Sequence, residues 1–353
     1  MQYWITDENV KMIGRTCMEQ GVLWCGHSGS GIEFQMTGTS VTVVLVGDDT
    51  TQGNVTEGKA RVGIYVNGRR ILDTMLEQPE QRFCVFQSSE PQTVTVRIIK
   101  LSECAMSAMG IRDIEAETID GIHPTAKKKH TIEFVGDSIT CGFGVDLEDP
   151  DTPFQTNTED VTHAYAYKVA EKLNADYSMV CFSGYGVLSG YTDADIRQDD
   201  QLVPTYYEKV GFSYARPFGT MQLQDVSWNF ANNQPELVVI NLGTNDDSYC
   251  KDDTLKQQQF TEKYIDFLKM IRRNNPKTTI LCIVGLMGGR IYPAVESAVD
   301  QYRNQTAETN VYAMKLNEQL PEDGLVSCSH PTEISQEKAS LAVVNKIKQI
   351  MKW

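Results

Sequence analysis

Ser138 lies in the segment Gly136-Asp-Ser138-Ile-Thr, directly after an apolar run. A serine hydroxyl is a weak nucleophile until a neighbouring base takes its proton. At a turn from a strand into a helix, the hydroxyl is exposed near backbone N–H groups, and the helix dipole favours negative charge there. These features predict a nucleophile for acyl transfer, although Asp and Ser also cap helices that have no catalytic role.

The base must be one of the five histidines. His27 falls in a β-rich front part of the chain, and His123 and His130 fall in the segment that follows it. His163 comes early in an expected helix, after an acidic loop, where an exposed or hydrogen-bonded structural role is the simpler interpretation. His330 stands in the segment Ser-His330-Pro-Thr, just before the last expected helix. We therefore expect His330 to take the proton of the serine hydroxyl.

Two further segments are expected to supply donors for a developing oxyanion. Asn245, in the segment Gly-Thr-Asn245-Asp, can aim a side-chain amide N–H at the oxyanion. Gly184 and Gly186 follow another apolar run, and a glycine lets a backbone N–H approach a substrate closely. The pattern does not separate Gly184 from Gly186, so both are candidates. Because Asn245 and then His330 follow Ser138 along the chain, a catalytic role for Ser138 is favoured over a helix-capping role alone.

The nucleophile, the two glycines and the asparagine each follow a predicted strand in the part of the chain after His130. Apolar runs alternate there with helical patterns, which is typical of βαβ units around a parallel sheet. The expected strands cover 131–135, 177–182, 237–242 and 279–284, and the expected helices cover 162–174, 256–274, 294–309 and 332–351. In such an open α/β sheet, ligands bind beyond the carboxyl ends of the strands.

Up to about residue 120, the apolar pattern has the two-residue period of strands. Expected strands cover 31–36, 40–46, 61–66, 82–86 and 93–99. Asn67-Gly68 between two apolar runs predicts a tight hairpin. Short strands without an intervening helical period favour a β-sandwich or jelly roll. We expect this all-β domain over 1–122, a linker with a basic cluster over 123–130, and the α/β domain over 131–353.

Together, Gly-Asp-Ser138, the strand-end glycines, Gly-Thr-Asn245-Asp and His330-Pro resemble the four sequence blocks of the SGNH (GDSL-type) hydrolases. The β-rich front domain is similar to that of carbohydrate esterase family 2, in which a jelly roll precedes an SGNH domain. The resemblance covers essentially the whole chain and implies a flavodoxin-like, three-layer α/β domain. It also implies Ser138 as nucleophile, His330 as general base, and an oxyanion hole built from the Ser138 amide, Gly184 or Gly186, and Asn245.

One position departs from the common SGNH pattern. That pattern has an aspartate three residues before the histidine, and Ser327 occupies this position here. The resemblance to family 2 implies a variant with a Ser–His dyad, in which a backbone carbonyl orients the imidazole. A carbonyl fixes the tautomer but stabilises imidazolium less than a carboxylate does. Glu333, Asp323 and Glu322 remain alternative acids from nearby in the sequence.

Several other residues are candidates for contacting a sugar. Tyr185, Tyr191, Trp228 and Tyr249 lie in or near expected strand-end loops, or before the third strand of the α/β part, and their rings can stack on sugars. For any single ring, ordinary packing is the more common role. Asp137 is also a candidate, although a carboxylate at such a turn more often binds the backbone.

The resemblance implies an O-acetylesterase acting on acetylated mannan, glucomannan or xylan oligosaccharides, often at the sugar 6-hydroxyl. The reaction passes through an acyl-enzyme and uses no metal or cofactor. Two alternatives stay open: an SGNH lipase or thioesterase with an apolar acyl pocket, and an inert carbohydrate-binding protein. The preferred sugar and hydroxyl, the role of the β domain and the oligomeric state stay open as well.

The chain of 353 residues has 47 acidic and 32 basic residues, which gives a net charge of −15. This charge repels nucleic acids and anionic membranes at long range, so neither is an expected partner. The nine cysteines are scattered without a Cys-x-x-Cys pair, and no histidine spacing predicts a metal site. Reduced cysteines without a recognisable signal peptide predict a cytoplasmic protein, with a processed secreted form as the alternative.

Overall fold

The computed structural model describes residues 1–52, 58–147 and 149–353. By their internal contacts these residues form two compact units. The first unit comprises Met1–Lys128, Gln155–Glu159 and Lys209–Trp228. The second unit comprises Lys129–Phe154, Asp160–Glu208 and Asn229–Trp353.

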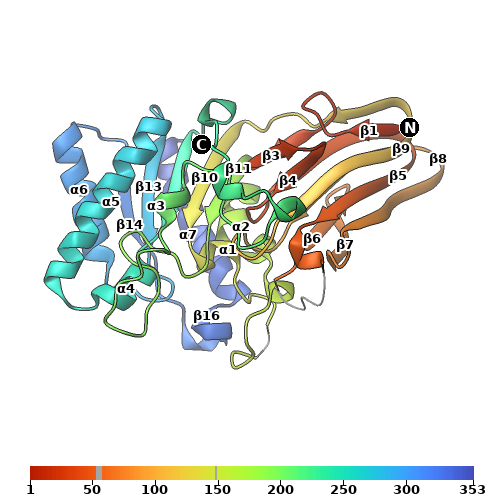
Figure 1. The fold of residues 1–353 in the computed structure, drawn as a ribbon. Helices are drawn as coiled ribbons and strands as arrows, with labels where there is room; N and C mark the ends of the chain where they lie inside the picture. Colours follow the sequence, from red (N-terminus) through yellow and green to blue (C-terminus); the bar gives the residue numbers. More distant parts are fainter. Residues whose placement is uncertain (53–57, 148) are drawn as a thin grey trace. The chain divides into compact units, whose positions relative to one another are not determined.

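The first unit is an antiparallel β-sandwich, as the alternating pattern predicted (Figure 1). Along β5, Phe34 and Met36 are buried while Gln35 between them is exposed, which is the alternation of a strand with one face on the core. The strands pair in the order β3-β4-β9-β5-β8-β6-β7, with β1 on β9 and β2 on β5. Their bounds are β1 (Gln2–Trp4), β2 (Lys11–Ile13), β3 (Thr16–Glu19), β4 (Val22–Cys25), β5 (Gly31–Gly47), β6 (Arg61–Val66), β7 (Arg69–Met75), β8 (Glu80–Lys100) and β9 (Met109–Pro124).

Two long strands replace pairs of shorter strands that the pattern predicted. β5 runs through both 31–36 and 40–46, and β8 runs through both 82–86 and 93–99. In β5 the pairing register shifts around Gly38, where a Cβ would lie 1.9 Å from the carbonyl oxygen of Glu117. In β8 the intervening residues are mostly exposed and polar, so they show no apolar alternation although they are extended.

The hairpin predicted at Asn67-Gly68 is confirmed. β6 and β7 pair antiparallel on either side of these two residues. Asn67 has φ +51° and Gly68 has φ +79°. A two-residue turn of this kind requires positive φ at both positions, and Asn and Gly adopt it at low cost.

The second unit contains an open parallel sheet in the order β11-β10-β12-β13-β14 (Figure 1). Strands β10 (His130–Gly136), β11 (Ala175–Cys181), β12 (Leu237–Asn241) and β13 (Thr279–Val284) confirm the four expected ranges. A fifth strand, β14 (Val311–Lys315), was not predicted. It is short and lies at the sheet edge, where most of its residues are only partly buried, so its sequence carries a weaker signal.

The helices of this unit cover both faces of the sheet. They are α1 (Ser138–Cys141), α2 (Tyr165–Lys172), α3 (Val203–Tyr206), α4 (Thr244–Cys250), α5 (Thr254–Asn274), α6 (Tyr292–Thr306) and α7 (Glu333–Met351). Right-handed crossovers put α2 on one face and both α5 and α6 on the other. The contacts agree, because α2 packs against α7 and α5 packs against α6 (Figure 1). The four predicted helices are thus confirmed, with ends within three residues of expectation.

The connection between the β-rich and α/β parts is shorter than the predicted linker. β9 continues through His123 and Pro124, and β10 begins at His130. Two later segments, Gln155–Glu159 and Lys209–Trp228, also belong to the first unit. The two units therefore interleave along the chain, which a change in composition at one point does not predict.

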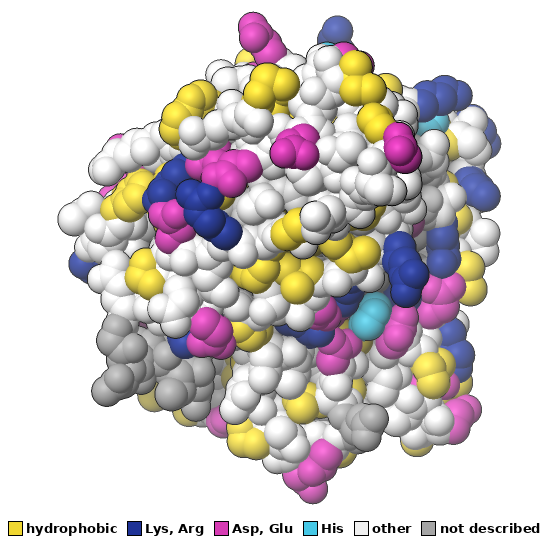
Figure 2. Space-filling model, turned by 90° about the vertical axis from the view of Figure 1, so that its right-hand side faces the viewer, with side chains coloured by type: hydrophobic (Ala, Val, Ile, Leu, Met, Phe, Trp, Pro, Cys, Tyr) yellow, Lys and Arg dark blue, Asp and Glu magenta, His cyan; other side chains and the backbone are white. Residues whose placement is uncertain are grey.

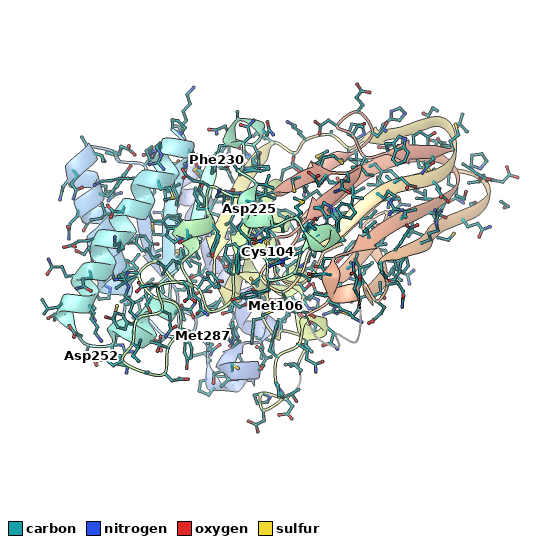
Figure 3. All side chains as sticks on the ribbon, in the orientation of Figure 1. Cys104, Met106, Asp225, Phe230, Asp252 and Met287 are labelled. Carbon is teal, nitrogen blue, oxygen red and sulfur yellow. The ribbon has the colours of Figure 1, made fainter. Side chains whose placement is uncertain are left out.

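Hydrogen bonds hold both later segments within the first unit. The Glu103 N–H donates to Glu159 Oε2 at 2.7 Å, and the Tyr214 N–H donates to the Ala105 carbonyl at 2.9 Å. Their partners Glu103 and Ala105 lie in the turn between β8 and β9, where Figure 3 labels the neighbouring Cys104. This turn therefore binds both later segments, and Asp49 adds a second contact, since its Oδ1 accepts the Arg216 N–H at 2.9 Å.

Charges of both signs are interspersed on the surface. On the face seen in Figure 2, basic side chains lie next to acidic ones. Among the ion pairs of the described residues, Lys168 Nζ lies 2.7 Å from Glu333 Oε1. Among the residues that the structure describes, none of the helices has the length and apolar composition needed to cross a membrane.

Candidate active site

Ser138 is positioned by a tight turn at the end of the central strand β10. A Cβ at Gly136 would lie 2.0 Å from Thr140 Oγ1, so the turn requires glycine. Asp137 caps the following helix α1, because its Oδ1 accepts the Ile139 N–H at 3.0 Å. Ser138 is the first residue of α1 and is 6% exposed. Since α1 is a single turn of four residues, the helix dipole expected at Ser138 is small.

His330 contacts the nucleophile directly. Its Nε2 lies 2.7 Å from Ser138 Oγ, and its Nδ1 lies 3.0 Å from the Ser327 carbonyl oxygen. Cys328 and Ser329 both have positive φ, of +54° and +61°, which turns the Ser327 carbonyl back onto the ring three residues later. Because a carbonyl only accepts, the proton of a neutral ring is on Nδ1, and Nε2 is left to accept the Ser138 hydroxyl proton.

The imidazole is packed against an aromatic ring that the sequence did not single out. The Phe143 ring lies 4.4 Å from the His330 ring, and Phe154 stacks on Phe143 at 3.9 Å. Burial lowers the pKa of His330 to about 4. The ring is therefore neutral at pH 7, as a general base must be.

The three carboxylates considered as a third catalytic residue have other partners or are exposed. Asp323 pairs with Lys338 at 2.7 Å, and Glu333 pairs with Lys168 at 2.7 Å. Glu322 is exposed in the short turn before β15 (Leu325–Val326). The observed partner of the imidazole Nδ1 is the backbone carbonyl of residue 327.

Asn245 lies in the first turn of α4, beyond the end of the neighbouring strand β12. Its Nδ2 donates to the Tyr185 carbonyl at 2.8 Å and approaches Asp137 Oδ2 at 3.4 Å. The side-chain amide is therefore next to the residue that precedes Ser138. Its second N–H is held only by the longer contact, so it is the one that can turn to an oxyanion.

The two candidate glycines differ in their surroundings. The Gly186 N–H donates to the Gln201 carbonyl at 3.1 Å, and a Cβ at Gly186 would lie 2.7 Å from Asp246 Oδ2. Gly184 has φ +81°, and a Cβ there would meet no atom within 4 Å. Since the Gly186 N–H is already bonded, the geometry favours Gly184 as the backbone donor.

Two carboxyl groups are buried beside these donors. Asp137 and Asp246 both have no exposed surface. Burial raises the pKa of Asp137 to about 7 and that of Asp246 to about 6. Asp137 binds the backbone of its own turn, and its burial removes it from contact with a substrate. Asp246 was not singled out from the sequence, although an acidic residue after a fully apolar strand is a usable signal.

The aromatic candidates have different environments. Tyr185 is 3% exposed and packs on Phe182, so its ring has a structural role. Trp228 belongs to the first unit, where Arg15 lies over its ring at 5.5 Å.

The remaining two rings belong to the second unit. Lys256 Nζ lies 4.1 Å from the centre of the half-buried Tyr249 ring. Tyr191 is 53% exposed, and its N–H donates to the Gly184 carbonyl at 2.8 Å. Of the four rings, Tyr191 is the exposed one next to the candidate donors.

One group of possible metal ligands lies within the described part of the chain. It consists of Asp146, Asp160 and His163. Each offers one side-chain atom that could bind a metal, and these three atoms lie within 4.8 Å of one another. His163 Nδ1 is bonded to Asp146 Oδ1 at 2.8 Å, and this hydrogen bond raises the pKa of His163. Asp160 Oδ1 accepts the Thr162 N–H at 2.9 Å. These contacts give each residue a structural role, as expected for His163.

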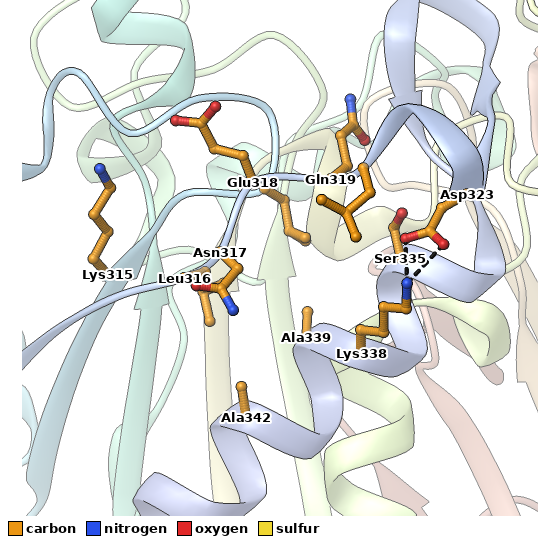
Figure 4. A pocket seen from close by; sticks show the side chains of 12 residues that line it. Lys315, Leu316, Asn317, Glu318, Gln319, Asp323, Ser335, Lys338, Ala339 and Ala342 are labelled. Atoms are coloured by element: carbon orange, nitrogen blue, oxygen red, sulfur yellow. Dashed lines mark hydrogen bonds and ion pairs between the residues drawn. The ribbon is translucent and has the colours of Figure 1, made fainter.

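A cavity of about 570 Å³ adjoins the loop that carries the histidine (Figure 4). Its walls come from the segment 315–320 and from α7, and Lys338 and Asp323 form an ion pair across one side. Gln319 Nε2 donates to the Ser329 carbonyl at 2.8 Å, which connects this wall to the residue before His330. The residues that line the cavity include neither member of the Ser–His pair.

Family comparisons assign both parts of the chain. Residues 134–328 match the model of the GDSL-like Lipase/Acylhydrolase family. Residues 12–125 match the Carbohydrate esterase 2 N-terminal model. These matches bear out the resemblance stated from the sequence motifs.

Individual relatives are distant in sequence. A cellulase/esterase of Acetivibrio thermocellus, CelE, is 26% identical over 338 residues, which cover 93% of this chain and 38% of that protein. This chain thus spans well under half of that relative. An acetylxylan esterase / glucomannan deacetylase of Cellvibrio japonicus is 22% identical over 354 residues, covering 99% of this chain and 90% of the relative.

Solved structures show the same fold. The acetyl xylan esterase Est2A of Butyrivibrio proteoclasticus has a TM-score of 0.86 at 23% identity, and the match covers 99% of this chain and 97% of that one. A family two carbohydrate esterase of Clostridium thermocellum, in complex with cellohexaose, has a TM-score of 0.82 at 23% identity. This match covers 98% of this chain and 99% of that one. At these identities the likeness establishes the fold.

Proposed function

Because the chain belongs to the GDSL-like Lipase/Acylhydrolase family, we propose that it is a serine esterase that removes acetyl groups from carbohydrates. The observation that carries the proposal is the 2.7 Å contact between Ser138 Oγ and His330 Nε2, with Nδ1 bonded to a backbone carbonyl. The Carbohydrate esterase 2 N-terminal match and the relatives named acetylxylan esterase / glucomannan deacetylase support the substrate class.

In the first half of the reaction, Ser138 Oγ attacks the acetyl carbonyl carbon while His330 Nε2 takes the hydroxyl proton. The C–O bond to the sugar then breaks, and His330 returns the proton to the leaving sugar oxygen. The product of this half is an acetyl ester on Ser138. In the second half, His330 takes a proton from water while the water oxygen attacks the ester carbonyl carbon. The bond between that carbon and Ser138 Oγ then breaks, His330 returns the proton to Ser138 Oγ, and the acetyl group leaves as acetic acid, which ionises to acetate.

The negative charge that develops on the carbonyl oxygen needs donors in both halves. We assign this role to the Ser138 N–H, the Gly184 N–H and Asn245 Nδ2. Asn245 reaches the oxyanion by giving up its 3.4 Å contact with Asp137 while keeping its bond to the Tyr185 carbonyl. Gly186 has no such role because its N–H is bonded to Gln201.

For substrate we propose acetylated oligosaccharides of the mannan, glucomannan or xylan type. Tyr191 is a suitable platform for a sugar ring, since it is 53% exposed and its backbone is bonded to Gly184. Tyr191→Ala should raise KM for an acetylated oligosaccharide at least severalfold and leave KM for an aryl acetate unchanged. Tyr214→Ala, at another exposed tyrosine, is the matched control. An equal effect of Tyr191→Ala on both substrates would remove Tyr191 from sugar binding.

The acyl group distinguishes this proposal from a lipase or thioesterase of the same family. Added methylenes that a small acyl site cannot hold cost about 1–3 kcal/mol in packing strain. We expect kcat/KM for aryl butyrate to be at least about tenfold below that for aryl acetate. Equal or faster turnover of butyrate would favour the lipase or thioesterase, and absence of turnover of every ester by the folded protein would favour an inert sugar-binding protein.

We further propose that the protein acts in a reducing compartment, such as a bacterial cytoplasm, on imported oligosaccharides. All nine cysteines are free thiols, and Cys84 and Cys328 are exposed. Exposed free thiols are kept by reducing conditions. Cell fractionation with an antibody to this chain tests the location, and recovery in the culture medium would contradict it.

The mechanism draws on no metal, so prolonged EDTA treatment should leave the activity unchanged.

A further inference from the structure

The side chain of Asp246 is enclosed by backbone N–H groups. Three consecutive residues donate to a single carboxylate oxygen, Oδ1: Val187 at 3.0 Å, Leu188 at 2.6 Å and Ser189 at 2.9 Å. Val187 also approaches Oδ2 at 3.1 Å. Asp246 has no exposed surface, so these donors replace water around the charge. Three such bonds on one buried oxygen are charge-assisted and strong.

These donors belong to the loop that carries the glycine of the oxyanion hole. Gly184 begins this loop, which covers 184–189 and has no regular secondary structure apart from one bridge at Gly186. A Cβ at Gly186 would lie 2.7 Å from Asp246 Oδ2, so the carboxylate and the loop backbone are in close contact. The neighbouring Asn245 donates to the Tyr185 carbonyl of the same loop. Two adjacent side chains of α4 therefore hold the loop, one as acceptor and one as donor.

We propose that Asp246 is a positioning residue of the esterase, which orders the loop 184–189 and thereby fixes Gly184 and Asn245 as oxyanion donors. The inference rests on the proposed function for its effect on catalysis, whereas the loop order that it requires can be measured without any reaction. A misplaced donor acts on the transition state more than on the bound substrate, so its loss lowers kcat rather than raising KM.

The charge of Asp246 is the property that matters. Burial raises the pKa of this carboxyl to about 6, while the bonds from Ser189, Leu188 and Val187 oppose that rise. The group is therefore ionised at pH 7. An asparagine would keep one acceptor oxygen but lose the charge, and its NH2 group would face the Val187 N–H. An alanine would leave three buried N–H groups without an acceptor, which is costly.

The nearest acidic neighbour provides a matched control. Asp247 lies in the same first turn of α4, but its carboxylate pairs with Arg290 at 2.9 Å and 3.0 Å. Asp247→Asn removes a negative charge one residue away and leaves the 187–189 N–H groups bonded. Any effect of charge on α4 in general would appear in both variants.

Two measurements test the proposal on the full chain. Hydrogen–deuterium exchange of the wild-type protein should show the N–H groups of 187–189 protected at least about a hundredfold, although they lie in a loop. For aryl acetate at pH 7, kcat should fall about 10-fold in Asp246→Asn and about 100-fold in Asp246→Ala, with KM within about threefold. Exchange at 187–189 should accelerate in the same order, and Asp247→Asn should match the wild type in both readouts.

Rapid exchange at 187–189 in the wild type would overturn the proposal even if every Asp246 variant failed to fold. Unchanged kcat in a folded Asp246→Asn protein with faster exchange would overturn the catalytic part. Neither result would affect the Ser138–His330 mechanism. Conversely, an active Ser138→Ala protein would refute the proposed function and leave the measured loop order in place.

Discussion

The two sides of Ser138 use charge in opposite ways. On the base side, His330 is packed on Phe143 and its Nδ1 is held by the Ser327 carbonyl. On the oxyanion side, the carboxyl groups of Asp137 and Asp246 are fully buried and hold backbone N–H groups. Buried carboxyl groups thus hold the backbone on the proposed oxyanion side, whereas a backbone carbonyl orients the proposed base.

This difference has a physical consequence for the reaction. The imidazolium that forms in the transition state is stabilised by a carbonyl dipole, which is weaker than the carboxylate of a triad. Burial also lowers the pKa of His330 to about 4, so the ring is a weak base that is neutral over a wide pH range. The proposed mechanism therefore assigns a large share of the rate enhancement to the oxyanion side.

The largest expected effect is the loss of the Ser–His pair itself. Ser138→Ala and His330→Ala should each lower kcat on an aryl acetate by at least about 10³-fold, because either change removes the nucleophile or its base. His163→Ala, at a surface histidine of the same unit, is the control and should retain activity. Near wild-type turnover by a folded Ser138→Ala protein would refute the mechanism.

The next effect isolates the oxyanion side. Asn245→Ala should lower kcat by about 10²–10³-fold with little change in KM, since its amide donates mainly to the charge that develops during the reaction. Steady-state kinetics on aryl acetate separates the two constants. A change confined to KM would mean that Asn245 binds the sugar instead.

A pH profile separates the two sides. A base whose pKa is lowered to about 4 stays neutral above that value, so His330 should cause no fall in kcat/KM between pH 7 and pH 5.5. The profile is measured on Asp246→Asn, because burial raises the pKa of Asp246 to about 6 and the asparagine does not titrate; in this variant kcat/KM at pH 5.5 should remain within about twofold of its value at pH 7. A fall with a midpoint near pH 7 would contradict a controlling role of His330. Asp137→Asn would then identify its source, because burial raises the pKa of Asp137 to about 7 and the asparagine does not titrate.

A smaller effect is expected from the ring that covers the base. Phe143→Leu keeps an apolar contact but removes the ring that stacks between His330 and Phe154. We expect kcat to fall about 3- to 10-fold and the acid limb of the pH profile to move upward, because a less buried imidazole is more easily protonated. An unchanged profile would show that this ring does not control the pKa of His330.

The sequence predicted those parts of the fold whose pattern is local. The four apolar strands of the parallel sheet, the four long helices and the Asn67-Gly68 hairpin are confirmed. β14 was missed because an edge strand is only partly buried. The interleaving of Gln155–Glu159 and Lys209–Trp228 with the first unit was missed because it depends on long-range contacts.

Within the site, the motif order predicted Ser138, His330 and Asn245, and the structure places His330 against Ser138 and Asn245 against Asp137. The choice between Gly184 and Gly186 needed the hydrogen bond from Gly186 to the Gln201 carbonyl, which no spacing reveals. The roles of Phe143 and Asp246 likewise depend on which residues they meet in space. Local spacing indicates candidate catalytic residues, and tertiary contacts show which side chains surround them.

The absence of a carboxylate requirement on the base side is the central claim. Asp323 and Glu333 are paired with lysines, Glu322 is exposed, and the Ser327 side chain is not the group that contacts His330. Removing the acid of a true triad costs about 10⁴-fold in kcat. The contrast with a dyad is therefore large enough to measure directly.

The decisive measurement is kcat on one aryl acetate for single alanine variants at these positions, beside His330→Ala, with thermal melting to verify folding. The variants are Ser327→Ala, Glu333→Ala, Asp323→Ala and Glu322→Ala. All four should keep kcat within about tenfold of the wild type, whereas His330→Ala should lose at least about 10³-fold. A folded Glu333→Ala, Asp323→Ala or Glu322→Ala protein that lost as much as His330→Ala would contradict the dyad and identify the missing acid.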